Sequence, residues 1–217
     1  MLSQFPGLSF FSEEHEQSLN VKYFRQDAPL EVLLDPIDGT RYYLDNRDQY
    51  QIIVAIHDRC ELVGALLFQP RLDRCYIAIK GEGAYVLTHS EALLGARGTR
   101  LLLTATSGSV LVFNQPEMVR KLAPLFDVRD IMVEYAKNPG LYNSTDILID
   151  RALASISAPC QAIDGGAIAF IAREAGATVT DFSGNAMANF RESPKRILPE
   201  ILVSTCPRAH EQILRAL

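Results

Sequence analysis

The sequence has no closely spaced cysteines. Its four cysteines are Cys60, Cys75, Cys160 and Cys206, and no two of them form a Cys-x-x-Cys pair. A zinc knuckle needs neighbouring thiols and a disulfide framework needs a denser set, so both classes are excluded. The four histidines form neither a His-x-x-x-His nor a Glu-x-x-His set, which argues against a histidine-based metal site.

Long apolar runs and a basic excess are also missing. The longest apolar stretches, such as 51–56 and 64–68, are too short to span a bilayer, and no basic, apolar leader opens the chain. We therefore expect a cytoplasmic protein with no membrane partner. The net charge is −5, so a nucleic-acid polymer is not an expected partner. Small anionic substrates fit if a bound cation reverses the sign of the site.

The chain of 217 residues suits one large domain or two smaller ones that share a core. Its first half predicts an antiparallel sheet, because β-rich runs alternate with turns. The predicted strands are Glu31–Leu34, Tyr50–His57, Glu61–Phe68, Arg74–Lys80 and Ala84–Leu87. Gly95 and Gly98 loosen the chain near 90–100. We therefore predict a metal-binding sheet subdomain over 1–95 and an α/β subdomain over 96–217 that completes the site.

The second half predicts alternating strands and helices, so the fold class is α/β with layered sheets and helices. The clearest helix is 164–175, because apolar residues recur on one 3.6-period face and Gly176 ends it. The other expected elements are strands at 101–104, 130–133, 177–180 and 201–204, strand and turn over 146–156, and helices at 116–126 and 208–217.

The most informative motif is the hexapeptide Asp35-Pro36-Ile37-Asp38-Gly39-Thr40, which follows an apolar strand. Pro36 keeps Asp35 extended, and Gly39 permits a sharp turn before a short helix at Thr40. Two carboxylates and a turn carbonyl are the hard oxygen ligands that Mg²⁺ prefers. The N–H groups of Gly39, Thr40 and Arg41 would form an anion cradle. Asp-x-x-Asp-Gly alone favours a capped surface turn, whereas the whole hexapeptide is more specific.

Two weaker acidic elements accompany the hexapeptide. Ser12-Glu13-Glu14 places two carboxylates after an apolar run, and alone it reads as a solvated helix start. Ile163-Asp164-Gly165-Gly166-Ala167 opens the apolar helix, with Glu174-Ala175-Gly176 at its end. Asp164 is also an ordinary N-cap residue, and a capping aspartate can still face a metal.

Together these three motifs resemble the inositol monophosphatase superfamily, whose members include inositol monophosphatases, bisphosphate nucleotidases, histidinol phosphatases and fructose-1,6-bisphosphatases. The resemblance runs from about Phe10 to the end of the chain. It implies the sugar-phosphatase arrangement of alternating helix and sheet layers. It further implies an Mg²⁺-dependent phosphomonoesterase that hydrolyses a small phosphorylated metabolite with a metal-activated water, and a homodimer.

The resemblance also assigns roles to individual residues. Two or three Mg²⁺ ions would be held by Glu13, Asp35, the Ile37 carbonyl, Asp38 and Asp164, with Glu14 near a third ion or outside the ligand set. Glu13 and the Thr40 hydroxyl would orient and deprotonate the water. Gly39, Thr40 and Arg41 would bind the phosphate.

Several departures from the family pattern bear on substrate and activity. Only 1–12 precede Glu13, so the segment that normally supplies the carboxylate partner of Thr40 is expected to be missing. Ser157 stands where inositol enzymes carry a glutamate, whereas Arg41 and Pro159 resemble the nucleotidases. We expect a nucleotide-type substrate ahead of an inositol phosphate. The alternatives are a catalytically impaired family member that acts as a structural or regulatory subunit, and a plain acidic cation-binding module.

Overall fold

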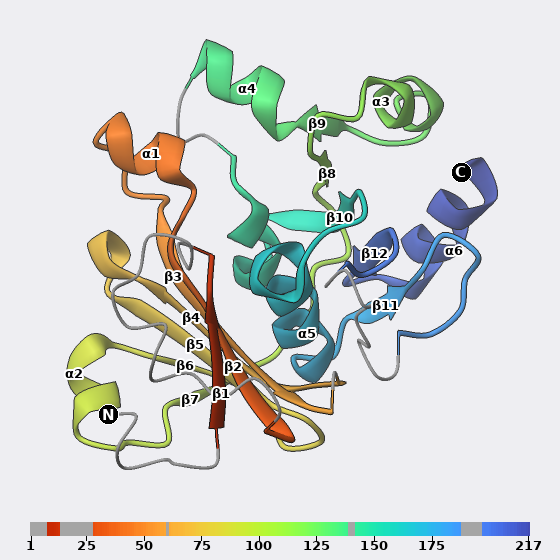
Figure 1. Ribbon diagram of the computed structural model, residues 1–217. Coiled ribbons are helices and arrows are strands. Elements are labelled where there is room, and N and C mark those ends of the chain that lie inside the picture. The colour runs from red at the N-terminus through yellow and green to blue at the C-terminus, as the bar shows by residue number, and fades with distance from the viewer. Residues whose placement is uncertain (1–7, 14–27, 60, 139–141, 188–196) are drawn as a thin grey trace.

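Two sheets with a helix packed between them organise the chain (Figure 1). The computed structural model describes residues 8–13, 28–59, 61–138, 142–187 and 197–217. Within these ranges the first sheet has seven strands in chain order: β1 (Leu8–Ser12), β2 (Leu30–Asp38), β3 (Gln51–Asp58), β4 (Glu61–Gln69), β5 (Arg74–Ile79), β6 (Gly83–Leu87) and β7 (Thr99–Leu101).

The antiparallel sheet predicted for the first half is confirmed from β2 to β7. β1 adds a parallel strand at the edge, with Ser12 opposite Leu34. The strands follow the period-2 pattern of a sheet with one core-facing side. In β3, for example, Ile53 and Ala55 are fully buried, whereas Ile56, on the alternate side of the strand, is exposed.

The second sheet is mixed, as predicted for an α/β second half. Its strands are β8 (Ser109–Val112), β9 (Val128–Asp130), β10 (Ala152–Ser157), β11 (Thr178–Thr180) and β12 (Ile201–Ser204), in the order β11-β12-β10-β8-β9. β8 runs parallel to both β9 and β10, while β12 runs antiparallel to β10 and β11. The carboxyl ends of β8 and β10 therefore meet at one edge.

The helix between the sheets is α5 (Ala167–Glu174), which touches strands of both. Its residues from Ala167 to Ala172 are all buried, as expected for a helix covered on two sides. Phe170 and Ile171 belong to a core that both sheets share. On the far side of the second sheet, α3 (Pro116–Leu122) and α6 (Pro207–Ala216) bury Leu122 and Ile213 in a second core.

The remaining helical segments are short and surround the edges of the sheets. They are α1 (Thr40–Leu44), η4 (Pro70–Leu72), α2 (His89–Leu93), α4 (Ile131–Lys137), η5 (Ser144–Ile149) and η6 (Ala162–Gly166). In Figure 1, α1 and α4 lie at the same end of the molecule, above the first and second sheets respectively.

The strand predicted over 130–133 is wrong, because β9 ends at Asp130 and α4 begins at Ile131. The β-branched residues there suggested a strand. The Asp130 carboxylate instead caps the helix by accepting the Met132 N–H at 3.0 Å, and it also accepts the N–H groups of Asn114 and Gln115 at 3.1 and 3.0 Å. A single buried side chain thus ends one strand and starts a helix.

Other element boundaries also differ between the prediction and the structure. The strand predicted over 101–104 ends at Leu101, because the N–H groups of Thr104 and Ala105 donate to the Asp150 carboxylate instead of to a neighbouring strand. β8 was not predicted. The segment 146–156 is a 3₁₀ helix followed by β10, and the helix predicted over 164–175 is divided into η6 and α5.

The division into subdomains at residue 95 stays a prediction, and the first sheet continues past it to Leu101. Within the described ranges, no helix combines the length and the apolar character that crossing a bilayer requires.

Candidate functional site

The parallel pairing of β1 with β2 places two predicted site residues side by side. Ser12 lies opposite Leu34, and the N–H of Glu13 donates to the Leu34 carbonyl at 3.0 Å. Glu13 therefore leaves β1 next to Asp35 on β2. Parallel strands end at the same edge of a sheet, so both carboxylates emerge together.

The turn after Asp35 is built from an irregularity in the β2–β3 ladder. Asp35 lies opposite Ile53 and Asp38 lies opposite Gln51, so β2 accommodates one extra residue between these pairs. The Asp35 carboxylate accepts the Ile37 N–H at 2.9 Å, which holds the bend from within.

Gly39 sets the direction in which the chain leaves this turn. Its φ of 77° is in the left-handed region, and a Cβ atom there would lie 3.1 Å from Cδ2 of Tyr42. α1 follows directly. The hydroxyl of Thr40 donates to the Ile37 carbonyl at 3.2 Å, so the first residue of α1 is tied back to the turn.

Asp164 reaches the same place from the second half of the chain. It lies in η6, where its φ and ψ of −123° and −124° interrupt the helical path, and η6 packs against β2 and β3. Close packing behind it excludes larger residues. A Cβ at Gly165 would lie 3.0 Å from Cys160 Sγ, and one at Gly166 would lie 2.6 Å from Leu198 Cδ1.

These elements enclose a cavity of about 610 Å³ at the carboxyl ends of β8 and β10. Seven of the eight predicted site residues line it: Glu13, Asp35, Asp38, Gly39, Thr40, Arg41 and Asp164. Ile37 does not line it, and its carbonyl accepts the Thr40 hydroxyl. Glu14 lies outside the described residues. The cavity therefore collects acids that are far apart in the sequence.

Three aspartates of this cavity have a raised pKa. Burial, followed by repulsion from Asp38 and Glu13, raises the pKa of Asp35 to about 8, although the Ile37 N–H opposes this shift. Asp164 reaches solvent within the cavity. Desolvation by the surrounding protein, followed by repulsion from Asp38 and Glu13, nevertheless raises its pKa to about 6. Burial also raises the pKa of Asp38, against hydrogen bonds from Gln51 and the Gly39 N–H.

This donor set fits a hard divalent cation. Several carboxylates that repel one another in a partly desolvated cavity are stabilised by a positive charge, and oxygen ligands are those that Mg²⁺ and Ca²⁺ take. Within the described ranges, however, no three acidic, histidine or cysteine side chains already converge as a ligand cluster. The residues share one cavity, and their carboxylates would have to draw closer around a cation.

An aromatic cluster forms the wall between α1 and α4. The guanidinium of Arg41 lies 4.7 Å from the ring centroid of Tyr135, and the rings of Tyr42 and Tyr135 meet edge to face at 4.9 Å. The Tyr135 hydroxyl donates to the carboxylate of Asp45. Arg41 is thus held against an aromatic face at the cavity rim, with its charge still exposed.

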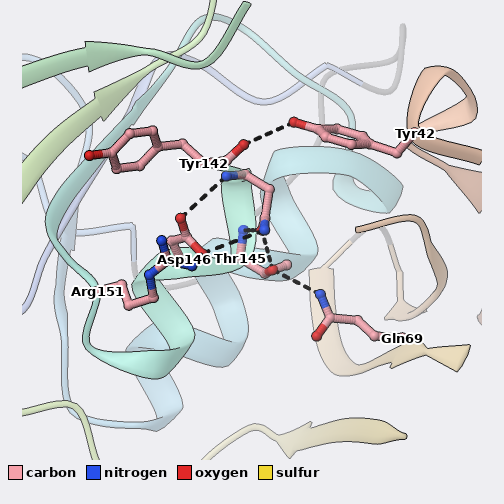
Figure 2. A network of polar contacts seen from close by, with 7 residues as sticks. Tyr42, Gln69, Tyr142, Thr145, Asp146 and Arg151 are labelled. Carbon is pink, nitrogen blue, oxygen red and sulfur yellow. Dashed lines mark hydrogen bonds and ion pairs between the residues drawn. The ribbon is translucent and has the colours of Figure 1, made fainter. Parts of the chain in front are cut away.

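A polar network supports the adjoining wall, where Asn143 lines the cavity (Figure 2). The Thr145 N–H donates to Oδ1 of Asn143 at 2.8 Å, and Gln69 Nε2 donates to the Thr145 hydroxyl at 2.9 Å. Tyr42 donates to the Tyr142 carbonyl at 3.0 Å, which joins α1 to this segment. The buried Asp146, next to Thr145, forms an ion pair with Arg151 at 3.4 Å.

Several cavity residues were not predicted from the sequence to belong to the site. They are Gln51, Val112, Phe113, Ile131, Met132, Tyr135 and Asn143. Most are apolar and read as core residues, and Asn143 reads as a loop residue. Only Gln51 was anomalous, as a polar residue at a core-facing position of a predicted strand.

The whole chain, residues 1–217, matches the sequence model of the inositol monophosphatase family. An inositol-1-monophosphatase of Rhizobium meliloti is 29% identical over 188 residues, which cover 82% of this chain and 65% of that protein. A Haemophilus influenzae protein named Nus factor SuhB is 25% identical over 187 residues, which cover 82% of this chain and 67% of that protein. The chain thus spans about two thirds of the length of these curated relatives.

Solved structures share the fold. The crystal structure of an IMPase/NADP phosphatase complexed with Mg²⁺ and phosphate superposes with a TM-score of 0.67 at 19% sequence identity. The match covers 99% of this chain and 75% of that chain. Sheets and helices are therefore arranged alike over nearly all of the chain, despite low identity.

Proposed function

The chain belongs to the inositol monophosphatase family, and from this premise we propose that it is an Mg²⁺-dependent phosphomonoesterase. The observation that carries the proposal is the shared cavity. Glu13, Asp35 and Asp38 from the first sheet and Asp164 from the second half of the chain all line it. A related fold has been crystallised with Mg²⁺ and phosphate, which supports the same pair of ligands here.

We assign the cation to the carboxylates of the cavity. Its ligands would be Glu13, Asp35, Asp38 and Asp164, with the Ile37 carbonyl as a further oxygen. When bound, Mg²⁺ supplies positive charge against a phosphate and lowers the pKa of a coordinated water. The cavity is negatively charged without it, so a phosphorylated substrate would bind only with the cation.

The phosphate would bind where the chain turns into α1. The N–H groups of Gly39 and Thr40 would donate to it, the former in exchange for its present hydrogen bond to the Asp38 carboxylate, and Arg41 adds a positive charge at the cavity rim. Glu13 would accept a proton from the attacking water, and the Thr40 hydroxyl would help to orient it. Fixed donors and charges of this kind supply most of the catalysis in phosphoryl transfer.

The cavity suits a substrate with one polar end and one apolar or flat part. Its volume of about 610 Å³ falls within the usual range for small ligands. An apolar side of the lining is contributed by Val112, Phe113, Ile131 and Met132. This apolar side favours a nucleotide-type phosphate over an inositol phosphate, whose ring presents hydroxyl groups all round.

The decisive test is Asp35→Asn. We expect Mg²⁺-dependent hydrolysis to fall by about two to three orders of magnitude, because a charged ligand is lost while the shape is kept. The substrates would be adenosine bisphosphate, inositol phosphate, histidinol phosphate and fructose bisphosphate. Asp58→Asn, at the far end of β3, is the matched control, because Asp58 forms an ion pair with the exposed Arg59. Turnover that survives Asp35→Asn unchanged would rule out the assignment.

The second candidate is a family member that acts as a structural or regulatory subunit. Two observations favour it: the described carboxylates are not drawn together as a ligand cluster, and the Thr40 hydroxyl is engaged by the Ile37 carbonyl. A relative also carries the name of a Nus factor. Absence of turnover on the whole substrate panel, with Mg²⁺ present, would support this candidate. Cytoplasmic location and a homodimer stay predictions.

A further inference from the structure

Gln51 is a buried amide in a row of core residues. It begins β3, lies opposite Asp38 in the β2–β3 ladder, and is followed on the same face by Ile53 and Ala55. Only 2% of Gln51 is exposed. Burying an amide costs free energy unless it is hydrogen-bonded, so its contacts explain why it is tolerated there.

The two ends of this amide have different surroundings. Nε2 donates a hydrogen bond to Oδ2 of Asp38. Oε1 is buried and accepts no hydrogen bond from the residues that the structure describes. The orientation follows from chemistry, because an ionised carboxylate only accepts hydrogen bonds and must face the NH₂ end. Gln51 also lines the cavity, so this amide lies at the edge of the site.

The consequence for Asp38 is a fixed carboxylate. The turn holds its two aspartates by different means. Asp35 accepts the Ile37 N–H from within the turn, whereas Asp38 accepts the Gly39 N–H and is held in addition by a side chain from the neighbouring strand. With Oδ2 bound to Gln51, rotation of the Asp38 carboxylate would break a buried hydrogen bond.

We propose that Gln51 is a positioning residue, which holds Asp38 in the orientation that binds the divalent cation and thereby sets the affinity of the cavity for Mg²⁺. The inference deepens the proposed function and rests on it. Groups that orient metal ligands commonly contribute about 10- to 100-fold to metal affinity. The unpaired Oε1 adds an acceptor for a water or hydroxyl group that enters with the cation.

The test measures Mg²⁺ binding without substrate. The thermal midpoint of the purified chain would be followed against Mg²⁺ concentration, because a ligand that binds only the folded state raises the midpoint once its concentration exceeds its Kd. We expect Gln51→Met, which keeps the length and removes the donor, to weaken apparent Mg²⁺ affinity about 10- to 100-fold. Gln69→Met is the matched control, since Gln69 is equally buried in the same sheet and donates to Thr145 instead.

Two further measurements separate positioning from plain packing. If Gln51 has only a structural role, both glutamine variants would lower the midpoint in EDTA and leave Mg²⁺ affinity unchanged. That result would overturn the proposal.

The second measurement is a double variant. In an Asp38→Asn background, Gln51→Met should have no further effect on Mg²⁺ affinity, because Gln51 acts through Asp38. An undiminished effect would also overturn the proposal. If Gln51→Met does not fold, Gln51→Asn keeps an amide that is too short to reach Asp38.

The outcome for the wild-type chain separates this inference from the proposed function. A wild-type protein whose midpoint does not respond to Mg²⁺ contradicts both. A wild-type protein that binds Mg²⁺ and hydrolyses a phosphate, with Gln51→Met binding equally well, contradicts only the role of Gln51.

Discussion

The hydroxyl of Thr40 donates a hydrogen bond to the carbonyl oxygen of Ile37 across 3.2 Å. The family resemblance gives each group a separate task, the hydroxyl to orient water and the carbonyl to bind the cation. In the structure the two groups meet. A carbonyl oxygen has two lone pairs, so Ile37 retains acceptor capacity, but the hydroxyl proton is already used within the turn.

Thr40→Val tests whether that hydroxyl also serves the reaction. The change removes the hydroxyl and keeps the shape, so we expect kcat to fall about 100-fold or more if Thr40 orients the water. Thr40→Ser should retain most of the activity. Steady-state kinetics at saturating Mg²⁺ measure both. A valine variant as active as the wild type would show that the hydroxyl only closes the turn.

Glu174, in the third motif, has a structural explanation in the described residues. Its carboxylate accepts the Gly81 N–H at 2.9 Å and pairs with Arg173 at 2.8 Å, which joins α5 to the turn between β5 and β6. Glu174→Ala should therefore lower the free energy of unfolding by about 1 to 3 kcal/mol, measured in urea, with kcat unchanged.

The control for that change is Glu117→Ala. Glu117 pairs with Lys121 at 3.5 Å on the surface of α3, and such exposed pairs contribute little. We expect its effect to stay within about 0.5 kcal/mol. Loss of catalysis at unchanged stability in Glu174→Ala would assign the residue to the site instead.

His210 gives the fold a pH dependence away from the site. Thr180 Oγ1 donates to the Asp181 carbonyl at 2.8 Å, so it accepts from His210 Nε2, which lies 2.9 Å away. The other ring nitrogen, Nδ1, is buried and has no hydrogen-bond partner among the described residues. Burial lowers the pKa of His210, because protonation would leave a charge without an acceptor.

The sign of the effect follows from this lowered pKa. Below about pH 6.5 the unfolded chain protonates this histidine and the folded chain does not, so stability falls as pH falls until the folded pKa is reached. Chemical unfolding between pH 7 and 5 should show a slope that is smaller in His210→Gln, by at most about 1.4 kcal/mol per pH unit.

The acidic site was accessible from the sequence because its chemistry is local. Asp35 to Thr40 form one turn, and proline, glycine and two aspartates define it without help from the rest of the fold. The family match confirms the resemblance drawn from these motifs. The metal and catalytic roles themselves stay predictions.

What sequence reasoning missed depends on contacts between distant segments. The run 130–133 reads as a strand until Asp130, the last residue of β9, is seen to cap a helix and to accept N–H groups from Asn114 and Gln115. Tyr135 reads as core until α4 packs it beside Arg41. The burial of the Gln51 amide is explained only by its hydrogen bond to Asp38 on the neighbouring strand. Periodicity describes one segment at a time, so it cannot predict such pairs.

The placement of Asp164 has a consequence for the folding reaction. Asp38 and Asp164 are separated by more than half of the chain, and they share one cavity only when η6 rests on β2 and β3. Contacts between such distant segments require a large loss of chain entropy and form late. A nascent chain that has completed only the first sheet would therefore have three of the four carboxylates and no complete site. Cation binding would report that the last segments have docked.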